Sequence, residues 1–455
     1  MKKFFYKSSV LALAAGVLLT SCDPEIDAPD PSSGEADFST YVALGNSLTS
    51  GFQDGALYRE GQLNSYAVIL ADQFETVGGD SDFRVPLLAE GVSVGSPVVT
   101  PNGVVVPKRL VLAPVTDCLG NTSLAPVSSG LTDLSAFAPS AVTGPYNNLG
   151  VPGAKSFHLL APGYGNPAGV AQGTANPFFA RFASSPNTSV LADALAQDPT
   201  FFTLWIGNND VLGYALAGGT PQAGEREYPT DKALFQTYIG AIVTQLTAGG
   251  AKGAVANIPD VDKIPYFNTV PVNGLVLTAA QAQGLTAAYA QQGLTNITFQ
   301  AGANNFVVNE DGQIRKLKNG EKILLNIPQD QLKCQGLGSM TPIDDRYVLS
   351  EEELALIAEY TASYNATIQG IAQAQNLAFV DANAYLDRLA SGFAMSGVNY
   401  SSTLVTGNVF SLDGIHFAPR GAAIVANEFI KAINAKYKST VPLVDETQYR
   451  TVLLP

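Results

Sequence analysis

The sequence predicts an α/β protein in which helices cover a mostly parallel sheet. Short apolar runs alternate along the chain with segments of helical periodicity, which is the pattern of strands joined by helical crossovers. One run, residues 200–206, is apolar throughout, as expected of a strand buried on both faces. Two stretches, about 75–145 and 294–348, interrupt the alternation, so we interpret them as large insertions into one domain.

The elements of the predicted core follow in order along the chain. Residues 41–44 form an apolar strand that ends at Gly45, and residues 65–74 place apolar side chains at helical spacing. Ser350 followed by Glu353 fits a capping box and begins a long helix. The remaining predicted strands are 200–206, 253–258 and 377–380, and the remaining predicted helices are 189–197, 231–247 and 421–437.

The two insertions carry little helical signal. Gly, Pro, Val, Ser and Thr dominate the first, which indicates loops and short strands. In the second, turn signals at residues 309–312 and 318–320 predict hairpins. Both insertions should rise beside the functional site and shape its pocket.

The N-terminus has the features of a secretory signal. Basic residues precede an apolar run that is too short to span a bilayer and that ends in Leu19-Thr20-Ser21-Cys22. This ending resembles the lipobox of bacterial lipoproteins, which implies that residues 1–21 are removed and that the sulfur of Cys22 carries lipid. The alternatives are an ordinary signal peptide with an incidental cysteine and a transmembrane anchor. We therefore expect a secreted lipoprotein of the cell envelope, held at the outer membrane on its periplasmic or outer face.

The residues after Cys22 differ in composition from the rest of the chain. Residues 22–39 are rich in Asp, Glu, Pro and Ser and show no apolar periodicity, which predicts a flexible acidic tether. One domain with its two insertions is predicted over residues 40–440, and a C-terminal tail over 441–455.

Charge and cysteine content restrict the partners and the redox chemistry. The formal net charge is -14 and no Lys/Arg-rich run is present, which argues against nucleic acid. Apart from Cys22, the chain contains only Cys118 and Cys334. In an oxidising compartment these two are a possible disulfide, and two unpaired buried thiols are the alternative.

Four short motifs carry the chemical signal. Ser47 lies in Gly45-Asn46-Ser47-Leu48, directly after a predicted strand, where open α/β sheets place their ligands. That motif resembles the first block of the GDSL/SGNH hydrolases. The segments 148–154, 207–210 and 413–416 are similar to the family's later blocks and stand in the family's order.

The resemblance implies a fold and a reaction. The fold would be the three-layer, flavodoxin-like α/β/α sandwich of SGNH hydrolases, and the reaction would be hydrolysis of acyl esters through an acyl-enzyme intermediate. A serine hydroxyl needs a base to remove its proton, and histidine suits that task. We expect Ser47 to be the nucleophile, His416 its base and Asp413 the acid that orients the imidazole. The only other histidine, His158, has no carboxylate nearby in sequence and is expected to be structural.

The same resemblance implies an oxyanion hole. Its donors would be the backbone N–H groups of Ser47 and Gly153 and the side-chain amide of Asn209. The alternative for residues 207–210 is an ordinary helix N-terminus in which Asp210 caps the helix.

Two positions depart from the family pattern. Asn46 stands where the family name implies Asp, and Phe417 follows His416 where the family usually has Pro. Neither replaces a catalytic group, and we expect Asn46 to alter hydrogen bonding in its loop more than activity.

Rival functions remain at the level of the sequence. A surface lipoprotein could keep this fold only to bind glycan or lipid, although such a module would not need the complete set of catalytic groups. A metal-dependent hydrolase lacks a ligand cluster of suitable spacing, and neither a metal nor another cofactor is expected. The expected substrate is a small-molecule, lipid or glycan ester, with a preference for short- to medium-chain acyl groups. Contact with a membrane would be through the lipid anchor only, and no obligate protein partner is evident.

Overall fold

The computed structural model describes residues 30–100, 103–132, 134–140 and 143–454. The predicted signal peptide, Cys22 and the first part of the predicted tether lie outside the described residues. Within these ranges, no helix is both long and apolar enough to cross a membrane.

The core of the molecule is a sheet of five parallel strands. The strands are β1 (Tyr41–Gly45), β9 (Asn148–Gly150), β10 (Phe201–Trp205), β11 (Lys252–Ala256) and β19 (Ala378–Val380). Across the sheet their order is β19-β11-β10-β1-β9, and each pairs with its neighbours in parallel. Counted in chain order this is the 2-1-3-4-5 arrangement of flavodoxin-like folds, which confirms the predicted fold class.

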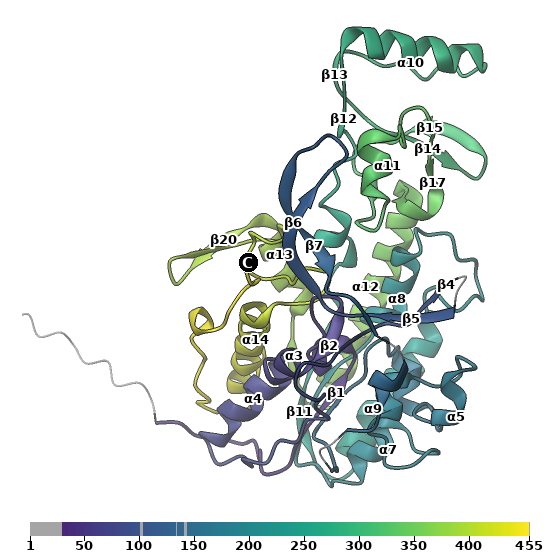
Figure 1. Ribbon diagram of the computed structural model, residues 1–455. Coiled ribbons are helices and arrows are strands. Elements are labelled where there is room, and N and C mark those ends of the chain that lie inside the picture. The colour runs from purple at the N-terminus through teal and green to yellow at the C-terminus, as the bar shows by residue number, and fades with distance from the viewer. Residues whose placement is uncertain (1–29, 101–102, 133, 141–142, 455) are drawn as a thin grey trace, which may run out of the picture.

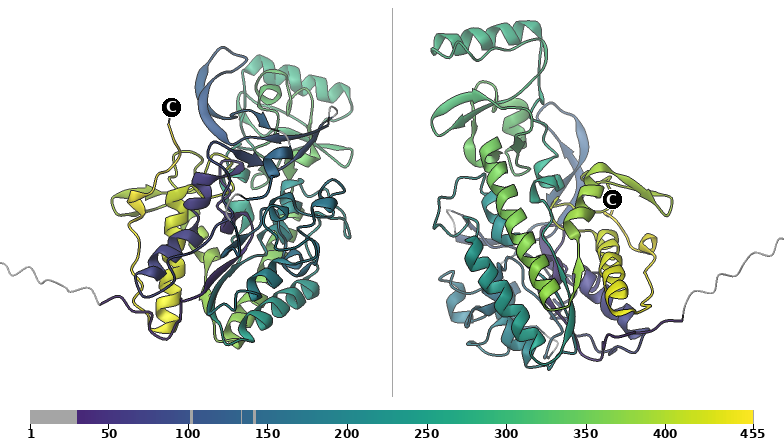
Figure 2. Two further views of the ribbon diagram at one scale, coloured as in Figure 1. Left: turned by 60° about the horizontal axis from the view of Figure 1, so that its bottom comes forward. Right: turned by 180° about the vertical axis from the view of Figure 1, so that it is seen from behind.

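Helices cover both faces of this sheet (Figures 1 and 2). On one face lie α4 (Tyr66–Glu75) and α14 (Pro419–Tyr437), and on the other lie α7 (Val190–Leu195), α9 (Lys232–Thr247) and α12 (Glu351–Ala374). Side chains alternate along each strand, so Leu44 packs with the α9 and α12 side whereas Ala43 packs with the α4 and α14 side. The predicted capping box is present at the start of α12, where Ser350 and Glu353 cap one another.

Short elements connect the core strands to their helices. They are α2 (Ser47–Ser50), β2 (Ala56–Tyr58), α3 (Arg59–Leu63), η2 (Ser156–Leu160), α5 (Pro167–Val170), α6 (Pro177–Ala180), α8 (Asn208–Leu216), η3 (Val261–Lys263), η4 (Pro265–Phe267), α13 (Ala382–Ser391), β20 (Phe393–Met395), β21 (Val398–Tyr400) and η6 (Glu446–Gln448). Of these, α2, α8, η3 and α13 contribute residues to the site described below.

The first insertion consists of loops and short strands, as predicted. Its elements are β3 (Ser93–Gly95), β4 (Val98–Thr100), β5 (Gly103–Pro107), β6 (Leu110–Thr116), β7 (Thr122–Ser128), β8 (Leu131–Thr132) and η1 (Leu134–Phe137). Strands β6 and β7 form a regular antiparallel hairpin that projects from the body of the molecule (Figure 1).

The second insertion is longer than the predicted 294–348. It includes β12 (Leu275–Leu277) and α10 (Ala279–Gln291), followed by β13 (Gly302–Asn304), β14 (Val307–Glu310), β15 (Gln313–Lys316), β16 (Lys322–Ile323), α11 (Gln329–Cys334), β17 (Ile343–Asp344), η5 (Asp345–Tyr347) and β18 (Val348–Leu349). Helix α10 lies at the far end of the molecule, away from the central sheet (Figure 1).

One of the two hairpins predicted in this insertion is absent. Residues 309–312 do join two paired strands, β14 and β15. The hairpin predicted at 318–320 was wrong, because β16 pairs with β18 instead of β15. The buried carboxylate of Glu321 accepts a hydrogen bond from the backbone N–H of Lys318 and binds Arg315. These contacts fix the turn, and the chain continues into β16, away from β15.

A disulfide joins the two insertions. Cys118, at the tip of the β6–β7 hairpin, is bonded to Cys334, the last residue of α11. Their Cα atoms are 6.3 Å apart, within the range that a disulfide requires. The alternative of two unpaired thiols therefore does not describe this structure.

The segment predicted to be a flexible tether is partly packed. Phe38 is 2% exposed, and its ring stacks on that of Phe74 in α4 with 4.0 Å between centroids. The backbone N–H of Glu35 also donates to the carbonyl of Tyr437 at the end of α14. The prediction was wrong for these last tether residues. The segment is acidic overall, but the apolar side chain of Phe38 packs against Phe74 of α4 and Phe201 of β10.

Candidate active site

The first strand ends in a tight turn that carries Ser47. The Asn46 side chain caps the one-turn helix α2, because its Oδ1 accepts from the Leu48 backbone N–H at 3.0 Å. Gly45 is required in this turn, since a Cβ there would lie 2.1 Å from Thr49 Oγ1 and 2.6 Å from the Trp205 carbonyl. Ser47 consequently stands at the carboxyl edge of β1, as the sequence predicted.

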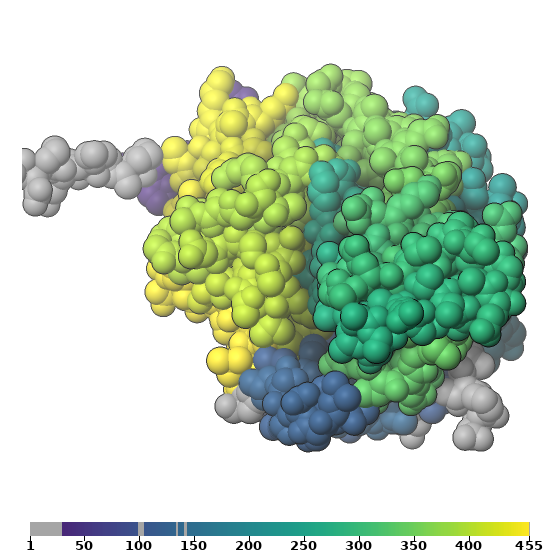
Figure 3. Space-filling view, turned by 90° about the horizontal axis from the view of Figure 1, so that it is seen from above, coloured from purple at the N-terminus to yellow at the C-terminus, as the bar shows by residue number. Residues whose placement is uncertain are grey.

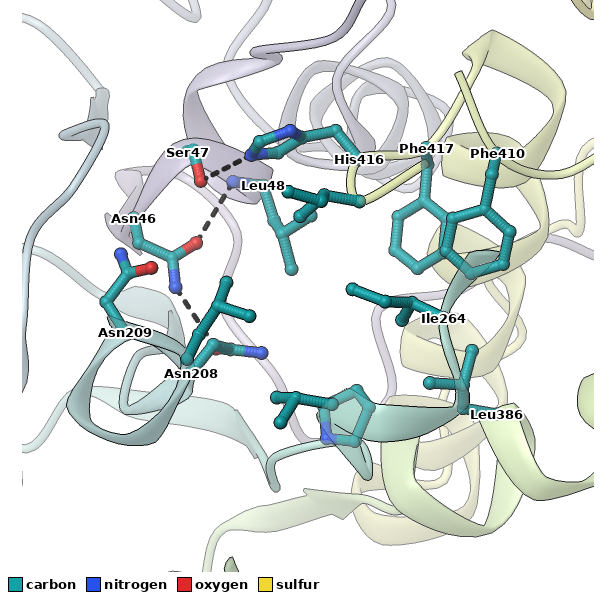
Figure 4. Close-up of a pocket in the computed structure, with 14 residues that line it drawn as sticks. Asn46, Ser47, Leu48, Asn208, Asn209, Ile264, Leu386, Phe410, His416 and Phe417 are labelled. Atoms are coloured by element: carbon teal, nitrogen blue, oxygen red, sulfur yellow. Dashed lines mark hydrogen bonds between the residues drawn. The ribbon is translucent and has the colours of Figure 1, made fainter. Parts of the chain in front are cut away.

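The structure brings Ser47, His416 and Asp413 together. Nε2 of His416 lies 2.8 Å from Ser47 Oγ, and Nδ1 lies 2.8 Å from Asp413 Oδ2. The serine and the histidine are 369 positions apart in the chain, and His416 lies in the loop before α14. Figure 4 shows the imidazole directed at the hydroxyl.

The Asp413 carboxylate is held in its charged form. Oδ1 accepts from the backbone N–H groups of Ile415 and His416 and from the hydroxyl of Ser411, and Oδ2 accepts from the N–H of Gly55. Burial acts to raise the pKa of Asp413, but the nearby His416 charge and these hydrogen bonds outweigh it and lower the pKa to about 2. An ionised Asp413 binds the proton on Nδ1, which leaves Nε2 to accept the proton of Ser47.

The three expected oxyanion donors belong to neighbouring turns. Gly153 has a φ of +78°, a conformation that glycine adopts without strain. Among the described residues, the backbone N–H groups of Ser47 and Gly153 donate to no acceptor. The Asn209 amide donates to the Ala154 carbonyl at 2.9 Å, which fixes its direction and leaves its second N–H for a ligand. Figure 4 shows this amide next to Asn46, on the same side of the pocket as Ser47.

Asp210 does not cap helix α8. The N-cap residue is Gly207, whose φ is +113°, and no side chain caps the helix. Asp210 is fully buried, and its two carboxylate oxygens accept from the backbone N–H and the hydroxyl of Ser156 at 2.8 and 2.6 Å. The capping interpretation was therefore wrong: this carboxylate ties the turn that carries Asn209 to the segment that follows Gly153.

His158 lies apart from this cluster in a structural setting. Its Nδ1 accepts from the backbone N–H of Lys155, and its ring stacks on Tyr164 with centroids 4.3 Å apart. Burial, together with the nearby charge of Arg226, lowers the pKa of His158 to about 4. The structural role expected from the sequence agrees with this environment.

An apolar pocket adjoins Ser47 and His416. Its polar lining comes from Asn46, Ser47, Asn208, Asn209 and His416, and its apolar lining comes from Leu48, Leu212, Pro259, Val261, Ile264, Leu386, Phe410, Ile415 and Phe417. The labelled side chains of Ile264, Leu386 and Phe410 lie on the side of the pocket away from Ser47 (Figure 4).

Seen from the end of the molecule that carries the insertions, the second insertion (green) and the segment around α13 (yellow-green) lie on either side of a hollow (Figure 3). Sequence reasoning did not identify the residues of α13 and η3 as pocket residues, because their apolar side chains look like ordinary core positions. It also missed Ser411 and Gly55 as donors to Asp413, although Asp54-Gly55 is a recognisable turn signal.

This combination of an open α/β sheet with a Ser–His–Asp contact series at the strand ends is that of a serine hydrolase acting on esters. The chain belongs to the GDSL-like lipase/acylhydrolase family, whose model matches residues 41–429. Within the described ranges, no group of three or more His, Cys, Asp or Glu side chains could hold a metal ion.

Comparison with solved structures gives only distant likenesses. The α/β hydrolase LAE5 from the metagenome of Lake Arreo, Spain, aligns with a TM-score of 0.36 and 10% identity, over 88% of this chain and 96% of its own. Axe2, an acetylxylan esterase from Geobacillus stearothermophilus, aligns with a TM-score of 0.35 and 11% identity, over 89% and 98%. No curated protein sequence matches the chain.

Proposed function

We propose that this protein hydrolyses carboxylic esters of short- to medium-chain acyl groups, with Ser47 as nucleophile, His416 as general base and acid, and Asp413 as the orienting carboxylate. The observation that carries the proposal is the pair of 2.8 Å contacts that join the imidazole to the hydroxyl on one side and to the carboxylate on the other. A hydroxyl held this way can lose its proton as it attacks.

The proposed reaction proceeds in two halves. Ser47 Oγ attacks the ester carbonyl while its proton moves to His416 Nε2, and the oxyanion that forms accepts hydrogen bonds from the N–H groups of Ser47, Gly153 and Asn209. When the intermediate collapses, the imidazolium gives its proton to the departing alcohol oxygen, and the acyl group remains on Ser47. A water molecule, deprotonated by His416, then attacks the acyl carbon. When this second intermediate collapses, the bond to Ser47 Oγ breaks, the imidazolium returns its proton to that oxygen, and the acid leaves.

The pocket supports an apolar acyl group. Its polar groups lie at the end where the ester would react, whereas the opposite end presents only hydrocarbon and aromatic side chains. Each methylene buried there contributes about 0.8 kcal/mol, or roughly fourfold in kcat/KM. An acetyl group would leave this lining empty, so we expect kcat/KM to rise from acetate to esters with several methylenes.

The proposal includes an anchor at the envelope through lipid on Cys22. In Figure 1 the described part of the chain begins, in purple, at the end of the molecule opposite the insertions, so a lipid anchor that precedes it would leave the insertions on the side away from the membrane. If the proposal holds, a Cys22→Ser variant moves from the membrane fraction to the soluble fraction. An unchanged distribution would contradict it.

A panel of p-nitrophenyl esters of increasing acyl length tests the function. We expect the wild type to hydrolyse the medium-chain esters with the highest kcat/KM and the Ser47→Ala variant to lose at least about 10³-fold on every ester. Equal rates for the two proteins would remove Ser47 from the mechanism.

A further inference from the structure

A two-residue turn brings a second buried carboxylate to the catalytic loop. Gln53 and Ala56 exchange backbone hydrogen bonds, and the turn between them consists of Asp54 and Gly55, with φ of +53° and +72°. Asp-Gly is the favoured pair for such a hairpin turn. The hairpin's own hydrogen bonds therefore leave the N–H groups of both turn residues free to contact another segment.

Both N–H groups contact the loop that carries Asp413. The Asp54 N–H donates to Ser411 Oγ at 2.9 Å, and the Gly55 N–H donates to Asp413 Oδ2 at 2.8 Å. The Ser411 hydroxyl donates in turn to Asp413 Oδ1 at 3.0 Å. The turn thus fixes both oxygens of the carboxylate that faces His416.

The side chain of Asp54 completes the contact from its own side. Its Oδ1 accepts from the Leu412 backbone N–H at 3.0 Å, and its Oδ2 accepts from the Tyr58 hydroxyl at 2.7 Å. Asp54 is only 7% exposed. An asparagine could accept from Leu412 in the same way and tolerates the left-handed backbone as well, so shape alone does not account for a charged residue here.

The charges around Asp54 come from three segments. Asp413 faces it from the catalytic loop, the Tyr58 hydroxyl from β2, and Arg450 from the C-terminal tail. Glu60 and Arg109 lie beyond them, Glu60 against Arg450 and Arg109 over the Tyr58 ring. Burial and the charge of Asp413 raise the pKa of Asp54, against the Leu412 and Tyr58 hydrogen bonds and the charge of Arg450. A second buried carboxylate beside the first is costly to ionise, and perturbed carboxylates of this kind gather at functional sites.

We propose that Asp54 is a positioning residue for the catalytic pair: its turn orients Asp413 toward His416, and its charge adds to that of Asp413 in stabilising the imidazolium. This inference rests on the proposed function for its catalytic meaning. The charge effect itself can be measured without any substrate.

The test compares Asp54→Asn with the wild type by two measurements. The first follows the His416 imidazole by ¹H–¹⁵N NMR against pH, with His158 as an internal reference. The second is the acid limb of the kcat/KM profile on a p-nitrophenyl ester. The control is Asp198→Asn, which makes the same exchange at a left-handed, exposed position outside the site.

For Asp54→Asn, both the His416 titration and the acid limb should move to lower pH by about half a unit or more, because a nearby negative charge is lost. We also expect kcat to fall by about tenfold with little change in KM, while Asp198→Asn matches the wild type. An unmoved titration and acid limb would overturn the proposal even if kcat fell, since a merely structural role lowers kcat alone.

A second variant covers the case in which Asp54→Asn does not fold. Asp54→Ser also removes the charge and keeps a short polar side chain, so the His416 titration should again move to lower pH. No movement in Asp54→Ser would then overturn the proposal. If the titration moves in either variant but the wild type hydrolyses no ester, the charge effect stands and the proposed function fails.

Discussion

At the scale of single residues, the site depends on a few side chains whose partners are fixed by short loops. Asn46 departs from the family pattern but keeps the hydrogen bond that caps α2. Its Oδ1 caps α2, as an aspartate oxygen would, and its Nδ2 donates to Asn208 Oδ1 at 3.1 Å. The residue therefore replaces a charge by an additional hydrogen bond between two turns of the site.

For this reason we expect Asn46→Asp to be mild. The new carboxylate keeps the contact with Leu48, and the Asn208 amide can turn to donate to it. Measured kcat/KM should stay within about threefold of the wild type. A loss of a hundredfold or more would show that the amide of Asn46 takes part in the reaction.

The Asp413→Asn variant should be severe. The amide cannot stabilise the imidazolium and favours the wrong tautomer of His416, so kcat should fall by about 10³- to 10⁴-fold. The change in KM on a p-nitrophenyl ester should be small, because Asp413 does not line the pocket. A variant with wild-type kcat would exclude the orienting role.

Asp413 also predicts how stability depends on pH. Burial raises its pKa, but the His416 charge and the hydrogen bonds outweigh burial and lower it to about 2, below the unfolded value of about 3.9. The stability that it contributes is present above about pH 4 and is lost as the pH falls toward 2. In denaturant titrations over this range, Asp413→Asn should lose less unfolding free energy than the wild type, whereas Asp198→Asn should follow the wild type.

At the scale of elements, α13 forms part of the pocket wall through Leu386. Leu386→Phe adds volume on the side away from Ser47, so it should lower kcat/KM for medium-chain esters by about tenfold and leave the acetate ester near the wild-type value. Leu234→Phe, on the exposed face of α9, is the matched control. An equal loss on all chain lengths would mean that the acyl chain does not reach α13.

The elements also show which local signals the sequence carries. The helices predicted over 65–74, 231–247 and 421–437 are present because their periodicity agrees with their packing. Side chains of Ser65 and Asp231 cap the first two, and the third begins at Pro419 without a side-chain cap. Strand β9 was not predicted, since three residues give no periodicity, and its place depends on pairing with β1.

The residues of the site also divide into those that sequence motifs predict and those that only the packing shows. The four motifs pointed to Ser47, Gly153, Asn209, Asp413 and His416, because their order along the chain matches that of the family, whereas any one of them alone resembles an ordinary turn. The contributions of Asp54, Ser411 and Leu386 could not be predicted, since they arise only when segments far apart in sequence are packed together. Their side chains, taken singly, resemble ordinary turn and core residues.

At the scale of the whole molecule, the disulfide links the two insertions through Cys118 and Cys334, which are 216 positions apart. Replacing both cysteines, Cys118→Ser with Cys334→Ser, should lower the unfolding free energy by about 2–4 kcal/mol, because the unfolded chain regains the freedom of a long loop. The catalytic groups lie outside both insertions, so kcat on the acetate ester should stay within about twofold. Thermal unfolding of the wild type with and without a reductant provides the control, and an unchanged Tm would contradict the prediction.

The central claim is that Ser47 is the nucleophile activated by His416. Labelling with a fluorophosphonate, followed by peptide mass spectrometry, tests it most directly. We predict one stoichiometric adduct on Ser47 in the wild type, none in Ser47→Ala, and a rate at least about 10³-fold lower in His416→Asn. An adduct on another residue, or labelling of Ser47 that does not depend on His416, would contradict the account.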